Sequence, residues 1–104
     1  MEEELLKIIE HFGVNNQQRK LQEEIFELQE AITTHELKKS VEYEIQLTEI
    51  IGTKEHIIEE IADICVIIRQ FMEIYNITQD EISERMANKI NRTLERIESG
   101  YYEK

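Results

Sequence analysis

Two short acidic blocks of the sequence share one pattern. Each reads acid-acid-Ile-x-acid-aliphatic, and the blocks are Glu23-Glu24-Ile25-Phe26-Glu27-Leu28 and Glu59-Glu60-Ile61-Ala62-Asp63-Ile64. A helix advances about 100° per residue, which puts Glu60 inside the apolar sector and Asp63 at its edge on the same side. Glu24 and Glu27 take the corresponding places in the first block. We therefore expect two helices to bring four carboxylates to one partly buried place.

Such a group of carboxylates needs a counter-ion, because their repulsion and lost hydration would otherwise cost several kcal/mol. A site made only of oxygens favours Mg²⁺, with Mn²⁺ as a substitute, and Mg²⁺ commonly takes substrate phosphates as further ligands. A di-iron bundle would require Glu-x-x-His pairs, and none of the three histidines follows a glutamate at that spacing. The alternative is that the acids are solvated surface charges, which we accept for Glu23 and Glu59.

Basic residues form a stripe near the end of this acidic chain. Its members lie within about 60° of one another on an expected helix and are Arg85, Lys89, Arg92 and Arg96. These side chains could reach triphosphate oxygens that a metal leaves unneutralised. Lys20, one turn before Glu24, is a further candidate. The alternative for both is ordinary surface pairing, for example of Glu81 with Arg85.

The apolar periodicity predicts an all-α, four-to-five-helix bundle in one domain of residues 1–104. A first helix is expected from about residue 3 to residue 12, ending at Gly13, and a second from Asn15 or Asn16, as N-cap, to about residue 33. Residues 34–52 are expected to form a connector with some helix. Thr53 should then cap a long helix of about residues 54–75, buried from several sides. The last helix should open with a Thr78/Glu81 capping box and stop near residue 100.

The charge balance limits the classes of partner. With 23 acidic and 12 basic residues, the formal charge of −11 disfavours nucleic-acid polymers and anionic membrane surfaces. An acidic start and a longest apolar run of only residues 64–68 argue against a secretory signal or a spanning helix, so we expect a cytoplasmic protein. Cys65, the only cysteine, is expected to be a small buried residue. A single domain of this size buries a modest core, which favours self-association.

The residues Glu23-Glu24-x-x-Glu27, the block at 59–63 and the segment 89–92 together resemble the MazG-like, all-α nucleoside triphosphate pyrophosphohydrolase family. The resemblance covers most of the chain and implies cleavage of ribo- or deoxynucleoside triphosphates to monophosphate and pyrophosphate, with a role in clearing unwanted nucleotides. It also implies a homodimer or homotetramer. The metal ligands and catalytic residues implied are Glu24, Glu27, Glu60 and Asp63. The triphosphate contacts implied are Lys20, Lys89 and Arg92, whereas Arg96 rests on helix geometry alone.

Two other functions fit the same residues. A non-catalytic acidic helical interaction module, for example an antitoxin-like protein, would share the amphipathic helices but would not depend on a divalent metal. A narrower enzyme of the same superfamily, a dUTPase or dCTPase, would differ in base selectivity. We assign no general base, because Glu23 points away from the expected site. Several aromatic residues could stack on a base, and none is assigned: His11, Phe12, Phe26, Tyr101 and Tyr102.

Overall fold

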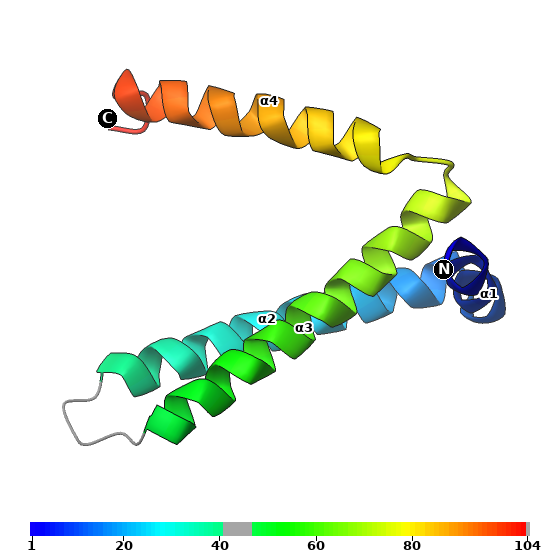
Figure 1. Cartoon of the computed structure of the whole chain (residues 1–104), viewed down its shortest axis with the longest axis horizontal. Helices are drawn as coiled ribbons and strands as arrows, with labels where there is room; N and C mark the ends of the chain where they lie inside the picture. Colours follow the sequence, from blue (N-terminus) through cyan, green and yellow to red (C-terminus); the bar gives the residue numbers. More distant parts are fainter. Residues whose placement is uncertain (41–46, 104) are drawn as a thin grey trace. The chain divides into compact units, whose positions relative to one another are not determined.

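The computed structural model describes residues 1–40 and 47–103 of the chain (Figure 1). These residues form four helices and no strand, which confirms the all-α prediction. The helices are α1 (Glu2–Phe12), α2 (Val14–Ser40), α3 (Leu47–Ile74) and α4 (Gln79–Glu98). The chain divides into two compact units, Met1–Ile74 and Tyr75–Lys104, which are described separately. The single domain, the pyrophosphatase type of bundle and the oligomer stay predictions.

Gly13 separates α1 from α2, as its position in the sequence predicted. Its φ of 88° lies in the left-handed region, which glycine adopts at no steric cost. Its N–H donates to the carbonyl of Ile9 at 2.8 Å and closes the last turn of α1. The expected N-cap at Asn15 or Asn16 is wrong, because α2 already begins at Val14. The Asn16 side chain instead donates to the carbonyl of Phe12 at 2.7 Å and satisfies the end of α1.

Helices α2 and α3 extend into most of the segment that we expected to be a connector. Residues 34–40 and 47–52 are helical, so the expected helix in this segment is present and is more extensive than predicted, while residues 41–46 lie outside the described part of the chain. Thr53 is not an N-cap, because it lies inside α3. Its hydroxyl lies 2.7 Å from Nδ1 of His35 and links α3 to α2. This contact between helices outweighs the local capping preference of threonine.

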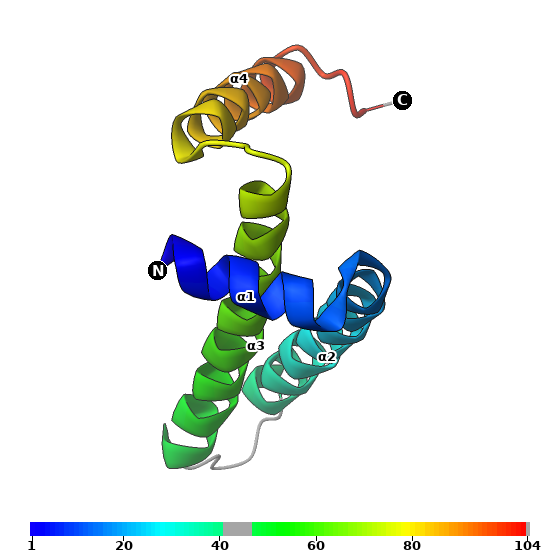
Figure 2. The same ribbon diagram turned by 90° about the vertical axis from the view of Figure 1, so that its right-hand side faces the viewer.

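The first unit is an antiparallel pair of long helices, α2 and α3, with α1 packed across them (Figure 2). Among the described residues, few apolar side chains are buried, namely Leu5, Ile9, Ala31, Ile67 and Met72. The expectation that the long helix is buried from several sides is wrong for one chain, because Ile58, Ile61 and Ile68 are all exposed. Cys65 is also exposed, contrary to expectation. A single chain does not supply enough apolar surface to cover α3 on every side.

The second unit consists mainly of the amphipathic helix α4. Thr78 is its N-cap, as predicted, since its hydroxyl accepts from the N–H of Glu81 at 3.2 Å and donates to the Glu81 carboxylate at 3.1 Å. The apolar face includes Met86, Ile90 and Leu94, each more than half exposed. Across the described residues, no helix combines the length and apolar character needed to cross a bilayer.

Candidate metal centre and adjoining pocket

Two glutamates occupy positions on α2 and α3 that apolar residues normally fill. Glu24 and Glu60 are each only 7% exposed, which confirms the inward orientation predicted from the helical wheel. One ligand atom from each, together with one from the exposed Asp63, lies within 4.8 Å of the others. We call these three residues the carboxylate cluster. Its oxygen donors match the ligand preference of Mg²⁺ and Mn²⁺.

The cluster contains two polar atoms whose hydrogen-bonding capacity is unused. The Oε2 atoms of Glu24 and Glu60 are buried, and neither has a hydrogen-bond partner among the described residues. Leaving a charged oxygen buried and unpaired is costly, so sequences seldom retain such an arrangement without a ligand. The two atoms belong to opposite helices and to the same cluster. A bound cation therefore fits the donor set and the unused oxygens together.

The two buried carboxyl groups have opposite pKa shifts. Burial is the main cause that raises the pKa of Glu60 to about 7, and the neighbouring Glu24 and Glu27 carboxyl groups also contribute to this increase. Burial also acts to raise the pKa of Glu24, but the adjacent Glu60 carboxyl and the Lys20 ammonium outweigh it and lower that pKa overall. Below about pH 7 the pair thus holds one proton, which resides mainly on Glu60. A metal that binds both carboxylates must displace this proton.

Three further charged residues surround the cluster. Nζ of Lys20 lies 3.3 Å from Oε1 of Glu24, so the ion pair that we weighed as its alternative role is present. Glu27, the fourth predicted ligand, is exposed and outside the cluster. Its charge nevertheless contributes to the raised pKa of Glu60, which places it nearby. Nε2 of His56 lies 3.8 Å from Oε1 of Glu60. His56 precedes Glu60 by four residues, which differs from the Glu-x-x-His spacing of di-iron bundles, so the sequence pattern did not indicate this histidine.

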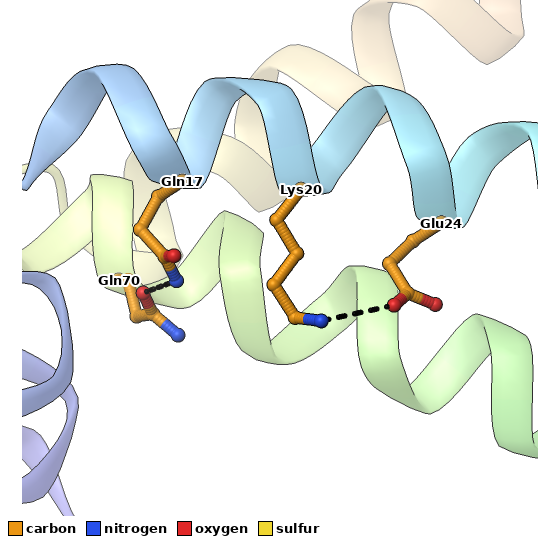
Figure 3. Close-up of polar contacts among 4 residues, drawn as sticks. All are labelled: Gln17, Lys20, Glu24 and Gln70. Atoms are coloured by element: carbon orange, nitrogen blue, oxygen red, sulfur yellow. Dashed lines mark hydrogen bonds and ion pairs between the residues drawn. The ribbon is translucent and has the colours of Figure 1, made fainter. Parts of the chain in front are cut away.

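A pocket of about 370 Å³ adjoins the cluster within the first unit. Its volume is within the range of small-molecule sites, roughly 300–1,000 Å³. We call it the cluster pocket, and its lining residues are Ile8, Phe12, Gln17, Lys20, Glu24, Asp63, Val66, Ile67 and Gln70. Figure 3 shows the polar residues in order along α2, from Gln17 through Lys20 to Glu24, with Gln70 opposite Gln17. The pocket thus has an acidic end, an ammonium group in the middle and an amide end.

Sequence analysis did not find the amide end. Gln17 and Gln70 are 53 positions apart, and glutamine in a helix carries no functional signal by itself. Phe12 also lines the pocket, although we had assigned no aromatic residue to it. A second pocket of about 470 Å³ lies further along α2 and α3, beside Lys38, Gly52 and His56. It contains no member of the carboxylate cluster, so the cluster pocket is the better candidate for a ligand of the metal.

The predicted basic stripe lies entirely on α4, in the second unit. None of its four residues makes an ion pair in the described part of the chain, and Glu81, the alternative partner of Arg85, receives a hydrogen bond from Thr78 instead. The guanidinium of Arg96 lies 4.6 Å from the centre of the Tyr101 ring. The triphosphate contacts assigned to Lys89, Arg92 and Arg96 stay predictions.

Comparison of the chain with protein-family models, with curated proteins and with solved structures finds no match. The geometry of the first unit and the residue pattern of the sequence therefore carry the functional interpretation.

Proposed function

We propose that this protein is a Mg²⁺-dependent pyrophosphohydrolase that cleaves ribo- or deoxynucleoside triphosphates to the monophosphate and pyrophosphate. The observation that carries the proposal is the pair of buried, unpartnered Oε2 atoms of Glu24 and Glu60 in the carboxylate cluster, two of whose members, Glu24 and Asp63, line the acidic end of the cluster pocket. The resemblance of the two acidic blocks to those of MazG-like enzymes supports the same reaction. A pocket with apolar walls and an acidic end suits a nucleoside carrying metal-bound phosphates.

In this proposal, different residues of the first unit bind the cation and the phosphates. Glu24, Glu60 and Asp63 would hold the cation, and Glu27, three residues further along α2 and outside this group, would join them as the fourth ligand. The bound cation would neutralise phosphate charge and lower the pKa of a water molecule. Lys20 is 53% exposed and extends over the pocket, so its ammonium can move from Glu24 to a phosphate oxygen when the cation takes over the carboxylate.

The second unit is assigned to the remaining phosphate charge. In this proposal Lys89, Arg92 and Arg96 bind triphosphate oxygens in a homodimer or homotetramer. Association is supported by the large apolar side chains left exposed in one chain, such as Phe26, Ile61 and Ile90. Large apolar side chains exposed on each of the two units commonly mark protein interfaces.

A non-catalytic helical interaction module is the competing proposal. The observation that favours it is the amphipathic α4, whose Met86, Ile90 and Leu94 side chains are more than half exposed. A partner protein could cover that face without any chemistry. This proposal gives no role to the unpartnered oxygens of the carboxylate cluster, and it is therefore the weaker one.

The decisive experiment is an assay of pyrophosphate release from a panel of ribo- and deoxynucleoside triphosphates, first with Mg²⁺ and then with excess chelator. Chelator-sensitive formation of monophosphate and pyrophosphate supports the enzyme and ranks its substrates. Release confined to a uracil or a cytosine nucleotide would identify the narrower enzyme. If no nucleotide releases pyrophosphate with either Mg²⁺ or Mn²⁺, the enzyme proposal fails and the interaction module remains.

A further inference from the structure

A pair of buried amides forms the end of the cluster pocket farthest from Glu24. Gln17 on α2 and Gln70 on α3 are 3% and 2% exposed, and Nε2 of Gln17 donates to Oε1 of Gln70 at 2.7 Å (Figure 3). Both residues line the pocket. Two apolar side chains would join the helices more simply, since each buried amide must satisfy three hydrogen-bonding groups. The two amides in the pocket wall are suited to binding a polar ligand.

The hydrogen bond between the amides leaves groups available for such a ligand. A primary amide has one carbonyl and two N–H bonds, so the pair retains the carbonyl and the second N–H of Gln17 and the amino group of Gln70. None of these groups has another partner among the described residues. The atoms that are both buried and unpartnered there are carboxylate oxygens of Glu24 and Glu60. The free amide groups therefore border accessible space, and they present a donor beside an acceptor.

A donor beside an acceptor is the pattern on the hydrogen-bonding edge of a nucleobase. Gln17 precedes Glu24 by seven residues, which corresponds to about 10 Å along a helix, with Lys20 between them. A nucleotide whose phosphates lie at Glu24 would extend its base toward the amides. Ile8 and Val66 supply apolar wall, and Phe12, 52% exposed, offers a ring face for stacking.

We propose that the Gln17–Gln70 pair recognises the base of the substrate and that it accepts either order of donor and acceptor. This inference rests on the proposed function and specifies its substrate. If both side chains turn their amides over together, the bond between them is kept while the free donor and the free acceptor exchange places. Uracil and cytosine have the same ring but opposite orders of donor and acceptor, so the pocket accommodates both. We expect kcat/KM values for UTP and CTP within about tenfold of each other.

The test is the Gln70→Glu variant, assayed at about pH 8.5, where a carboxylate is ionised. A carboxylate at this position only accepts, so Gln17 must donate to it, and the free groups of the pair become predominantly acceptors. Cytosine offers an amino donor to these groups, whereas the two carbonyls of uracil oppose them. We expect the ratio of kcat/KM for CTP to that for UTP to rise about tenfold over wild type. A matched Gln22→Glu variant, altered at an exposed glutamine of α2 outside the cluster pocket, should leave the ratio unchanged.

The possible results separate this inference from the proposed function. If wild type hydrolyses nucleotides but the ratio is the same in Gln70→Glu and wild type, or wild type prefers one base by more than about a hundredfold, the inference is overturned and the enzyme stands. If wild type hydrolyses no nucleotide, the proposed function fails. The base inference is then tested by calorimetry, which compares the affinities of uridine and cytidine for wild type and for Gln70→Glu.

Should Gln70→Glu not fold, the Gln17→Leu/Gln70→Leu double variant replaces it. That variant should weaken UTP and CTP binding about tenfold each and leave tripolyphosphate binding unchanged, and equal weakening of all three ligands would refute base recognition.

Discussion

Glu24 on α2 and Glu60 on α3 each bury one carboxylate oxygen, Oε2, that has no hydrogen-bond partner in the described part of the chain. The two residues belong to repeated acidic blocks 36 positions apart, and the antiparallel packing of the two helices brings them together. Their proximity works against folding when no ligand is present, because two carboxyl groups share a poorly hydrated site. A ligand with positive charge removes this cost, and the effect can be measured without a substrate.

Divalent metal should therefore stabilise the protein. At a metal concentration about 100 times the Kd, we expect an increase of about 2.7 kcal/mol in the free energy of unfolding, visible as a higher Tm in Mg²⁺ or Mn²⁺. The Glu24→Gln/Glu60→Gln double variant should lose this increase. The matched control is Glu23→Gln/Glu59→Gln, which removes the exposed acid of each block and should retain it. Equal metal responses in the two double variants would contradict the site.

Replacing Glu60 with glutamine should abolish pyrophosphate release while the protein stays folded. The amide preserves the shape of the side chain but is a poor ligand for a hard cation. Circular dichroism and a thermal melt check the fold, and the metal-free variant should be at least as stable as wild type, because a repelled carboxylate is removed. The neighbouring Glu59→Gln change serves as the control and should keep activity within about threefold. Undiminished activity of Glu60→Gln would exclude this residue as a ligand.

The stability of the metal-free protein should depend on pH through the carboxyl pair. The pKa of Glu60 is raised from 4.5 to about 7, so between these values the folded state binds more protons than the unfolded state. Its contribution to stability is therefore present at low pH and is lost as the pH rises toward 7. The lowered pKa of Glu24 acts in the opposite sense, since its contribution is present above its ordinary pKa of 4.5 and is lost on further acidification.

The groups that face Glu60 are Glu24 and Glu27 from α2 and His56 and Asp63 from α3, and Lys20 of α2 pairs with Glu24. Thermal melts of metal-free protein from about pH 4.5 to pH 7 should show a falling Tm that flattens in Glu60→Gln. A His56→Asn variant should keep the fall, and its loss there would assign the effect to the histidine. Metal affinity should rise over the same interval, because binding releases the proton of the pair.

Lys20 should contribute to substrate binding more than to folding. Its ion pair with Glu24 involves a half-exposed ammonium, so Lys20→Met should change the free energy of unfolding by less than about 1 kcal/mol. Loss of a phosphate contact should raise KM for nucleoside triphosphates about tenfold, and Lys20→Arg should recover part of the loss. Arg19→Met, altered at the adjacent exposed residue, should leave KM unchanged. A KM that is equally insensitive to both changes would remove Lys20 from the site.

The exposed apolar face of α4 should mediate association of identical chains. Ile90 is 55% exposed, and Ile90→Glu would bury a charge in any interface formed by this face, so sedimentation should show a smaller assembly than for wild type. Asn88→Glu adds the same charge about 160° away around the helix and should not change the assembly. Wild-type protein that remains monomeric at all concentrations would rule out the expected homodimer or homotetramer.

Helical periodicity was sufficient to predict the burial of Glu24 and Glu60, because the face on which a helical residue lies depends on spacing within one helix. The breaks at Gly13 and Thr78 were likewise predictable from backbone conformation and capping chemistry. The starts of α2 and α3 were predicted wrongly, because local sequence alone does not decide where a helix begins. Thr53 has a strong local preference for an N-cap, but a hydrogen-bonded contact with His35, 18 residues away, holds it within a longer helix.

The cluster pocket depends on pairings between helices that a single sequence does not reveal. Gln17 meets Gln70 only because α2 and α3 pack at one particular register, and that register is set by side chains along both helices. An amphipathic pattern also does not show which apolar residues a single chain buries. For this reason Cys65 was expected to be buried, although it is exposed. The basic residues of α4 were placed on one stripe by spacing alone, and their relation to the carboxylate cluster stays a prediction.

Because α2 and α3 form a hairpin, the carboxylate cluster is assembled only in the folded chain. Glu24 is contributed by one arm and Glu60 by the other, so the cation-binding geometry exists only while the two arms are closed on each other. If a cation binds there, opening the hairpin, even locally, would separate its ligands and release it. The local availability of divalent metal would therefore govern how long the chain survives proteolysis, since a metal-depleted compartment exposes the open form to cleavage while a replete one protects it.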